Sequence, residues 1–157
     1  MKVRDFCSRM VIAAEPATDL RHAARLMREH HVGALVVIDQ REGLTRPIGI
    51  VTDRDIVIAV VAADVKPESL TVRDVMSEEL QLLRDDDDVF EAVEKMSDHG
   101  VRRLPVVAAD GRLFGMVSAD DVLRVLSVEL GSLATTLHRG SQREVAARGA
   151  ALGGSAA

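Results

Sequence analysis

The chain has 157 residues, of which 47% are hydrophobic and 29% are charged, and its formal net charge is −5. This balance is typical of a folded globular protein rather than of a disordered chain. The negative charge, with 3 Phe and no Trp or Tyr, argues against nucleic-acid binding, which uses basic surfaces and aromatic stacking platforms. We therefore expect no nucleic-acid partner.

Cysteine usage and the first residues indicate the compartment. Cys7 is the single cysteine, so no internal disulfide can form, and this fits a reducing environment. The charged Lys2, Arg4 and Asp5 are unlike the start of a signal peptide. The longest apolar stretches, such as Ile56–Ala63, are too short to span a bilayer. The expectation is a cytoplasmic protein with no membrane partner.

An internal repeat organises the chain. Val3-Arg4-Asp5 recurs 69 positions later as Val72-Arg73-Asp74, and Cys7-Ser8 likewise falls on Met76-Ser77. Further along, Gly49-Ile50-Val51-Thr52 matches Gly115-Met116-Val117-Ser118 at an offset of 66. Because loops tolerate insertions better than core elements do, the three additional residues predict a longer turn in the first copy, around 40–47.

Each copy is predicted to begin with a short strand and an amphipathic helix. The strand candidates are Val11–Ala14 and Leu80–Leu83, each followed by turn-forming residues. Apolar side chains then recur every three or four positions, the period of one helix face, through Leu20–Met27 and Val89–Met96.

Polar residues mark where both helices start. Asp88 is followed by Glu91, the spacing of a capping box, and Thr18 or Asp19 is the matching cap in the first copy. The acidic run Asp85–Asp88 lacks the glycine and the terminal glutamate of a calcium loop. A solvated turn with a helix cap is the preferred interpretation, and no metal site is predicted.

Two further strands and a closing helix complete each copy. The apolar runs Ala34–Ile38 and Leu104–Ala108 predict strands buried on both faces. The next strands are expected at Ile48–Val51 and Leu113–Val117, and the closing helices at Asp55–Ala62 and Asp120–Leu130. The predicted organisation is a β-α-β-β-α unit at residues 1–62, a linker at 63–71, a second unit at 72–130 and a helical extension with a tail at 131–157. One unit alone is too small to bury its sheet, so the two should share a core.

Three motifs within this repeat are specific. They are Gly49-Ile50-Val51-Thr52-Asp53-Arg54-Asp55, Gly115-Met116-Val117-Ser118-Ala119-Asp120-Asp121 and Gly100-Val101-Arg102-Arg103-Leu104-Pro105-Val106-Val107. With the order of elements around them, they resemble the cystathionine-β-synthase (CBS) domain family over residues 3–130. A tandem pair of such domains is called a Bateman module, and this chain resembles the stand-alone bacterial type.

The resemblance implies an α/β (α+β) fold of two repeats related by a pseudo-twofold axis, with clefts between the sheets. Members of the family commonly bind AMP, ADP, ATP, NAD or S-adenosylmethionine there, and commonly form homodimers. A Thr or Ser and the Asp three residues later contact the nucleotide in the family. These positions map onto Thr52 and Asp55, and onto Ser118 and Asp121.

The chemistry of these residues suits such a ligand. Asp55 and Asp121 are expected in the first turn of a helix, where the dipole stabilises a carboxylate that can accept both ribose hydroxyls. Thr52 and Ser118 offer a hydroxyl beside backbone N–H groups that favour phosphate. Arg54 adds a charged fork for the phosphate.

The adenine ring is expected between aliphatic side chains. The candidates are Val11, Ile12 and Ala34 from the first copy, or Leu80, Leu82 and Pro105 from the second. Strand backbone groups would then read the edge of the base.

A purely structural interpretation competes with this one. In it, Thr52 and Ser118 are helix N-caps, Asp55 and Asp121 complete the capping boxes, and none of the four contacts a ligand. The copies also differ: the second has Asp120 where the first has Arg54, and a carboxylate there repels phosphate. Conversely, Arg102 and Arg103 replace Gly33 and Ala34. We therefore expect the Thr52/Asp55 site to be the better nucleotide site, with Arg102 or Arg103 reaching a phosphate across the cleft.

The function that follows is a non-enzymatic regulatory module that binds AMP, ATP or NAD as its ligand, without a catalytic cofactor, and signals in trans to an unknown effector protein. S-adenosylmethionine lacks phosphate, so Arg54 disfavours it. The alternative is a protein-interaction or dimerisation scaffold with vestigial clefts. An enzyme ranks last, because no nucleophile and base recur together in the sequence.

Overall fold

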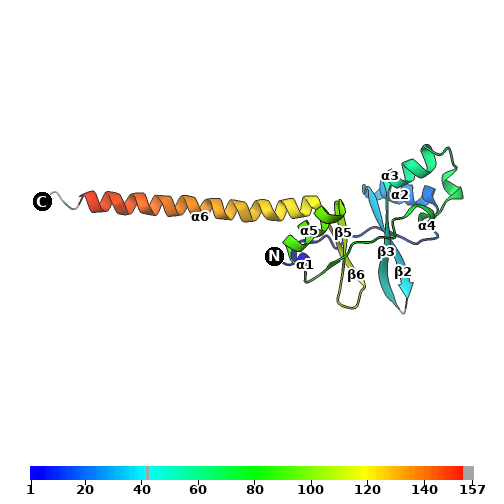
Figure 1. Ribbon diagram of the computed structural model, residues 1–157, viewed down its shortest axis with the longest axis horizontal. Coiled ribbons are helices and arrows are strands. Elements are labelled where there is room, and N and C mark those ends of the chain that lie inside the picture. The colour runs from blue at the N-terminus through cyan, green and yellow to red at the C-terminus, as the bar shows by residue number, and fades with distance from the viewer. Residues whose placement is uncertain (42, 154–157) are drawn as a thin grey trace. The chain divides into compact units, whose positions relative to one another are not determined.

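The computed structural model describes residues 1–41 and 43–153, with side chains described for residues 1–40 and 43–143. Contacts divide the chain into two units, residues 1–119 and residue 120 onward. The first unit contains both β-sheets, and the second is helical over residues 120–153 (Figure 1). None of the described helices combines the length and the hydropathy that crossing a bilayer requires.

The first sheet has three strands in the order β1-β2-β3. Strand β1 (Ala13–Ala14) pairs in parallel with β2 (Ala34–Arg41), which pairs antiparallel with β3 (Leu44–Thr52). Helix α2 (Leu20–His30) forms the crossover that two parallel strands need. The four-residue helix α3 (Asp53–Ile56) follows β3 directly.

The second sheet repeats this arrangement in the order β4-β5-β6. Its strands are β4 (Leu83–Arg84), β5 (Arg103–Val107) and β6 (Leu113–Ser118). Helix α5 (Val89–His99) is the crossover between β4 and β5. Helix α6 (Ala119–Gly153) comes next in the chain. The predicted α/β class, with β-α-β-β-α occurring twice, is therefore confirmed.

The leading strands are shorter than predicted, and the reason lies in the path of the chain. Ser77 pairs with Ile50 of the first sheet, whereas Leu83 pairs with Val106 of the second. Residues 78–82 therefore cross between sheets and cannot extend β4 back to Leu80. The same holds before β1, where Ser8 pairs with Met116 of the second sheet.

The extra residues of the first copy lengthen a hairpin instead of forming a long turn. Pairing between β2 and β3 continues outward to Arg41 and Leu44, so the turn predicted over 40–47 is wrong. The closing helix also differs from its prediction. Helix α3 starts at Asp53 and passes into the π-helical turn η1 (Val57–Val61).

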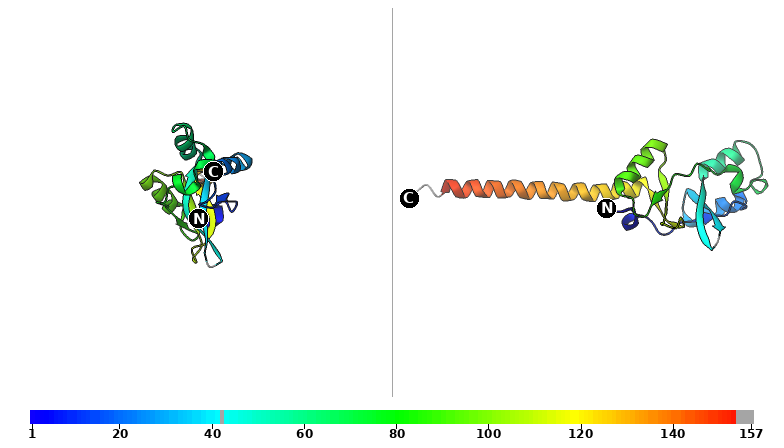
Figure 2. Two further views of the ribbon diagram at one scale, coloured as in Figure 1. Left: turned by 90° about the vertical axis from the view of Figure 1, so that its right-hand side faces the viewer. Right: turned by 60° about the horizontal axis from the view of Figure 1, so that its bottom comes forward.

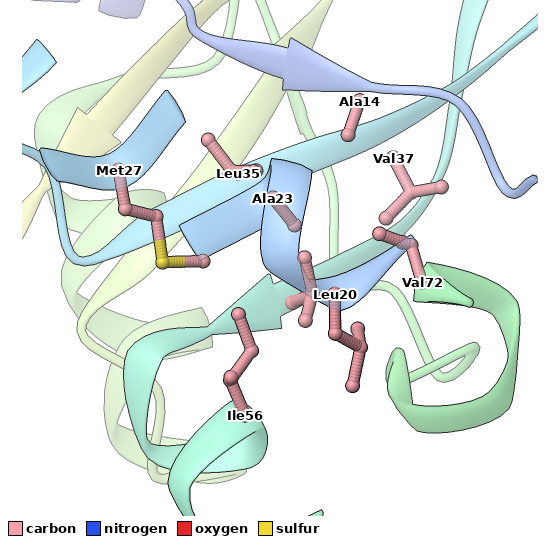
Figure 3. Packing of buried hydrophobic residues seen from close by; sticks show 9 residues of the cluster. Ala14, Leu20, Ala23, Met27, Leu35, Val37, Ile56 and Val72 are labelled. Atoms are coloured by element: carbon pink, nitrogen blue, oxygen red, sulfur yellow. The ribbon is translucent and has the colours of Figure 1, made fainter. Parts of the chain in front are cut away.

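A cluster of apolar side chains forms the core of the first repeat (Figure 3). Helix α2 contributes Leu20, Ala23 and Met27, which lie on the face that the predicted periodicity selects. Leu35 comes from β2. Val72, fully buried in the same cluster, comes from α4 (Val72–Val75), the short helix that precedes the second repeat. The full cluster is Ala14, Leu20, Ala23, Met27, Leu35, Val37, Val51, Ile56 and Val72.

The two repeats exchange their leading segments. The N–H of Val72 donates to the carbonyl of Thr18, and the N–H of Val3 donates to the carbonyl of Asp87, both at 2.8 Å. Helix α1 (Val3–Phe6) therefore completes the second repeat, just as α4 completes the first. Because each repeat needs the other's leader, residues 1–119 should unfold as one cooperative unit.

Two glycines allow this exchange. A Cβ on Gly49 would lie 2.9 Å from the carbonyl oxygen of Ser77, and one on Gly115 would lie 2.6 Å from that of Ser8. Both distances are far inside van der Waals contact with backbone atoms. The glycines that open the two repeated motifs are thus required by the close approach of the crossing segments.

Candidate functional site: a cleft between the two repeats

A cleft of about 440 Å³ lies within residues 1–119, a size that suits a small-molecule ligand. The end of β3 and the start of α3 form one side of it. The crossing segment before β4 and the start of β5 form the other. Its lining residues are Ala34, Ile50, Thr52, Arg54, Asp55, Ser77, Glu79, Leu80, Gln81, Gly100, Val101, Arg102, Arg103 and Leu104.

The turn from β3 into α3 is fixed by reciprocal hydrogen bonds. The backbone N–H and the hydroxyl of Thr52 both donate to Oδ2 of Asp55, at 2.8 Å and 2.7 Å. Thr52 Oγ1 in turn accepts from the N–H of Asp55 at 3.2 Å. The structural role considered from the sequence, a capping box, is therefore present. It also holds the Asp55 carboxylate at the edge of the cleft.

The same box occurs at α4, away from the cleft. The N–H and the hydroxyl of Thr71 donate to Oδ2 of Asp74 at 2.7 Å and 2.8 Å. These bonds lower the pKa of the Asp74 carboxyl, with the backbone N–H of Thr71 contributing most. Neither residue lines the cleft. The Thr71/Asp74 pair therefore serves as a control, because it caps a helix in the same way as Thr52/Asp55 but lies outside the cleft.

The difference between Gly33 and Arg102 is accompanied by a difference in the side chain packed beside each of them. The N–H of Asp53 donates to the carbonyl of Gly33 at 3.1 Å, and the equivalent bond joins Ala119 to Arg102 at 2.9 Å. A Cβ on Gly33 would lie 3.2 Å from the Asp53 carboxylate. In the first repeat the small Gly33 lies beside the larger Asp53, and in the second the large Arg102 lies beside the smaller Ala119. This exchange of sizes brings an arginine to the cleft.

Charge in the cleft favours an anion. Arg54, Arg102 and Arg103 are all exposed along its lining, against the carboxylates of Asp55 and Glu79. No ion pair within the described part of the chain engages the three guanidinium groups. Planar guanidinium groups bind phosphate oxygens in pairs, so the arrangement suits a phosphorylated ligand.

The rest of the lining is mostly apolar. Ile50 and Ala34 come from the first sheet, and Leu80, Val101 and Leu104 come from the second repeat. Such a surface can hold an uncharged ring while the charged rim holds polar groups.

The structure thus brings together seven of the predicted site residues: Ala34, Thr52, Arg54, Asp55, Leu80, Arg102 and Arg103. Four others do not line this cleft: Val11, Ile12, Leu82 and Pro105, of which Pro105 is fully buried within β5. Ser118 and Asp121 do not line it either: Ser118 ends β6, and Asp121 forms an ion pair with Arg124 in α6.

Sequence reasoning missed one side of the cleft. Ser77, Glu79 and Gln81 lie on the segment that crosses between the sheets, which was predicted in part as strand. The repeat aligned Ser77 with Ser8, but nothing in the sequence indicated that these segments cross between the sheets. No group of three or more His, Cys, Asp or Glu side chains able to hold a metal ion occurs among the described residues.

Curated sequence relatives match most of this chain. An uncharacterised protein of Methanopyrus kandleri is 38% identical over 125 residues, which cover 80% of this chain and 62% of that protein. The chain thus spans less than two thirds of that relative. Hypoxic response protein 1 of Mycobacterium tuberculosis is 33% identical over 123 residues, covering 78% of this chain and 83% of the relative.

Solved structures show the same fold. A structure of Hypoxic Response Protein I with two coordinated zinc ions is 32% identical, with a TM-score of 0.69 over 79% of this chain and 98% of that one. The CBS domain pair of protein MJ0100, in complex with 5′-methylthioadenosine and S-adenosyl-L-methionine, is 25% identical, with a TM-score of 0.68 over 80% of this chain and 99% of that one.

The family itself is settled by the two repeats. The CBS domain model matches residues 3–62 and again residues 72–128, which together make up most of the chain. These ranges contain the two sheets, the exchanged leaders α1 and α4, and the whole cleft lining. The protein belongs to the CBS domain family and carries a tandem pair of CBS domains.

Proposed function

We propose that the cleft binds a phosphorylated, adenosine-containing nucleotide such as AMP, ADP, ATP or NAD, and that the chain is a regulatory module of the cytoplasm rather than an enzyme. The observation that supports this most is the convergence of Arg54, Arg102 and Arg103 with Thr52 and Asp55 on one partly apolar cleft. Ligand occupancy would be read by an effector protein or across a homodimer.

Each part of a nucleotide has a counterpart in the lining. Asp55 uses Oδ2 for the capping box, so Oδ1 is the oxygen we assign to a ribose hydroxyl. The N–H of Asp55 is already engaged by Thr52, so phosphate binding relies on the arginines rather than on the start of the short α3. The adenine ring would pack against Ile50 and Leu80.

The relative with bound ligands supports the adenosine part of this proposal. The MJ0100 domain pair was crystallised with two adenosine compounds, 5′-methylthioadenosine and S-adenosyl-L-methionine, neither of which has a phosphate. The three arginines at this chain's cleft favour an adenosine compound that also carries phosphate.

One observation favours the second candidate, an interaction or dimerisation scaffold. Val57, Ile58 and Val61 on η1 are more than half exposed, and they form an apolar surface that a second copy or a partner protein would cover. A scaffold of this kind would leave the cleft empty.

Calorimetry on the purified chain with AMP, ADP, ATP, NAD and S-adenosylmethionine tests the proposal. We expect at least one phosphorylated ligand to bind, and Asp55→Ala to weaken it by at least tenfold, about 1.4 kcal/mol. A thermal-shift assay gives a second readout, because a ligand at 100 times its Kd stabilises the fold by about 2.7 kcal/mol.

Asp74→Ala is the matched control, since it removes the same capping box outside the cleft. It should lower the melting temperature and leave the affinity unchanged. Equal loss of affinity in both variants would mean that Asp55 acts only through the fold. The absence of binding by any nucleotide to the folded protein would favour the scaffold.

A further inference from the structure

Helix α6 carries a regular row of leucines. Leu123, Leu126, Leu130, Leu133 and Leu137 follow one another at intervals of three, four, three and four residues. This is the heptad spacing of coiled coils, in which successive a and d positions form one narrow seam. We call these five residues the leucine seam; it extends over about 21 Å of helix.

The seam faces solvent. Leu123, Leu130, Leu133 and Leu137 are between 61% and 73% exposed, and Leu126 is half-buried. The 35-residue α6 runs as one continuous helix (Figure 2). Exposed helices gain most of their stability from packing an apolar face, so this helix is expected to have a partner.

We propose that the leucine seam pairs with the same seam of a second copy of this chain, as a parallel two-stranded coiled coil. The nucleotide cleft plays no part in this contact, so the inference is independent of the proposed ligand.

The residues beside the seam favour a second copy as the partner. With Leu123 at position a, the flanking e and g positions between Leu126 and Leu137 hold Ser127, Glu129, Ala134 and Thr136. Only Glu129 is charged, and in a parallel pair it would face Ala134 of the other copy. Identical helices therefore meet without like charges across the interface.

The length of the seam selects the parallel orientation. In register, each of the five leucines packs against its own counterpart. In the best antiparallel register Leu126 packs against Leu137 and Leu130 against Leu133, which leaves Leu123 opposite Gly140. The parallel pair thus buries one more leucine layer. Gly140 occupies the next d position, so the seam ends at Leu137 in either orientation.

Sedimentation velocity on the full chain over a range of concentrations is the first test. We expect self-association that Leu130→Glu/Leu133→Glu weakens at least tenfold. The matched control is Val128→Glu/Thr135→Glu, which adds the same charges at exposed positions of α6 outside the seam. A monomeric wild-type chain, or equal behaviour of the two variants, would overturn the proposal.

Disulfide capture tests the orientation without disturbing most of the seam. In a Cys7→Ser background, Leu137→Cys should form a disulfide-linked dimer under mild oxidation, and Thr135→Cys should not. In the antiparallel register, residue 137 lies opposite residue 126 of the other copy, about 16 Å of helix rise from its counterpart. Linkage that appears only when Leu126→Cys is added would overturn the parallel arrangement.

Discussion

The two CBS repeats share a scaffold and differ in charge. Both use a glycine to admit the other repeat's leading segment, at Gly49 and Gly115, and their strands pair in the same order and directions. In contrast, Arg54 of the first repeat corresponds to Asp120 of the second, and Gly33 corresponds to Arg102.

This contrast shows where each kind of constraint acts. The exchange of leaders involves backbone atoms at short distances, so both copies must keep glycine and the extended path. Arg54, Arg102 and Arg103 in the cleft lining are exposed, so the two repeats can carry different charges there without disturbing the core. The result is that Arg54, Arg102 and Arg103, from both repeats, meet at one cleft.

The largest expected effect comes from disturbing the scaffold that the two repeats share. Gly115→Ala should lower the free energy of unfolding by about 2–3 kcal/mol, because its Cβ would meet the backbone carbonyl of Ser8. Gly49→Ala should cost about 1–2 kcal/mol, since the Met76 thioether can move aside although the Ser77 carbonyl cannot. Urea unfolding measures both.

Gly131→Ala is the control for these two variants, because its Cβ would meet nothing within 4 Å and alanine favours a helix. The Gly131→Ala variant should be at least as stable as the wild type. If either core variant matched the wild type, the close approach of the crossing segments would not be a real constraint.

The next largest effect is expected from changing the charge that distinguishes the two repeats. Arg54→Asp gives the first repeat the side chain of the second, and it should weaken ATP binding about tenfold, which is about 1.4 kcal/mol. Binding of 5′-methylthioadenosine, which has no phosphate, should change much less. Arg73→Asp places the same substitution at the corresponding position of α4, outside the cleft, and should have no effect on either ligand.

The smallest prediction compares the helix caps of the two repeats. Asp88 accepts hydrogen bonds from the N–H groups of Phe90 and Glu91, and these lower the pKa of its carboxyl, the bond from Glu91 most. Asp19 accepts one described bond, from His22. We expect Asp88→Asn to reduce the melting temperature at pH 7 more than Asp19→Asn does.

The pH dependence has a definite sign. A carboxyl whose pKa is lowered by folding stabilises the folded state above its unfolded pKa of about 3.9, and the contribution is lost as pH falls through the lower, folded value. Melting curves from pH 7 down to pH 3 should therefore show the wild type and Asp88→Asn converging. A constant difference would mean that the charge is not what stabilises this cap.

Several features of the fold and the site were predictable from local sequence. The α2 periodicity placed Leu20, Ala23 and Met27 in the core, and the Asp88/Glu91 spacing identified the cap of α5. Other local features were not predictable. His31 ends α2 with a φ of 53°, at the position where the second repeat has Gly100 with a φ of 63°. Nothing in residue type alone indicates that His31 adopts this conformation.

The sequence by itself determined the repeat and the order of its elements, because periodicity, capping and motif spacing are local properties of the chain. The resemblance of its motifs to the CBS family then pointed to seven residues that line the cleft. Only the tertiary structure decided which segments complete which repeat. Ser77 pairs with Ile50 and Ser8 with Met116, contacts between residues far apart along the chain. Those pairings bring Ser77, Glu79 and Gln81 into the same cleft as Thr52 and Asp55. One side of the cleft depends on where the chain crosses between the sheets, which no local pattern encodes.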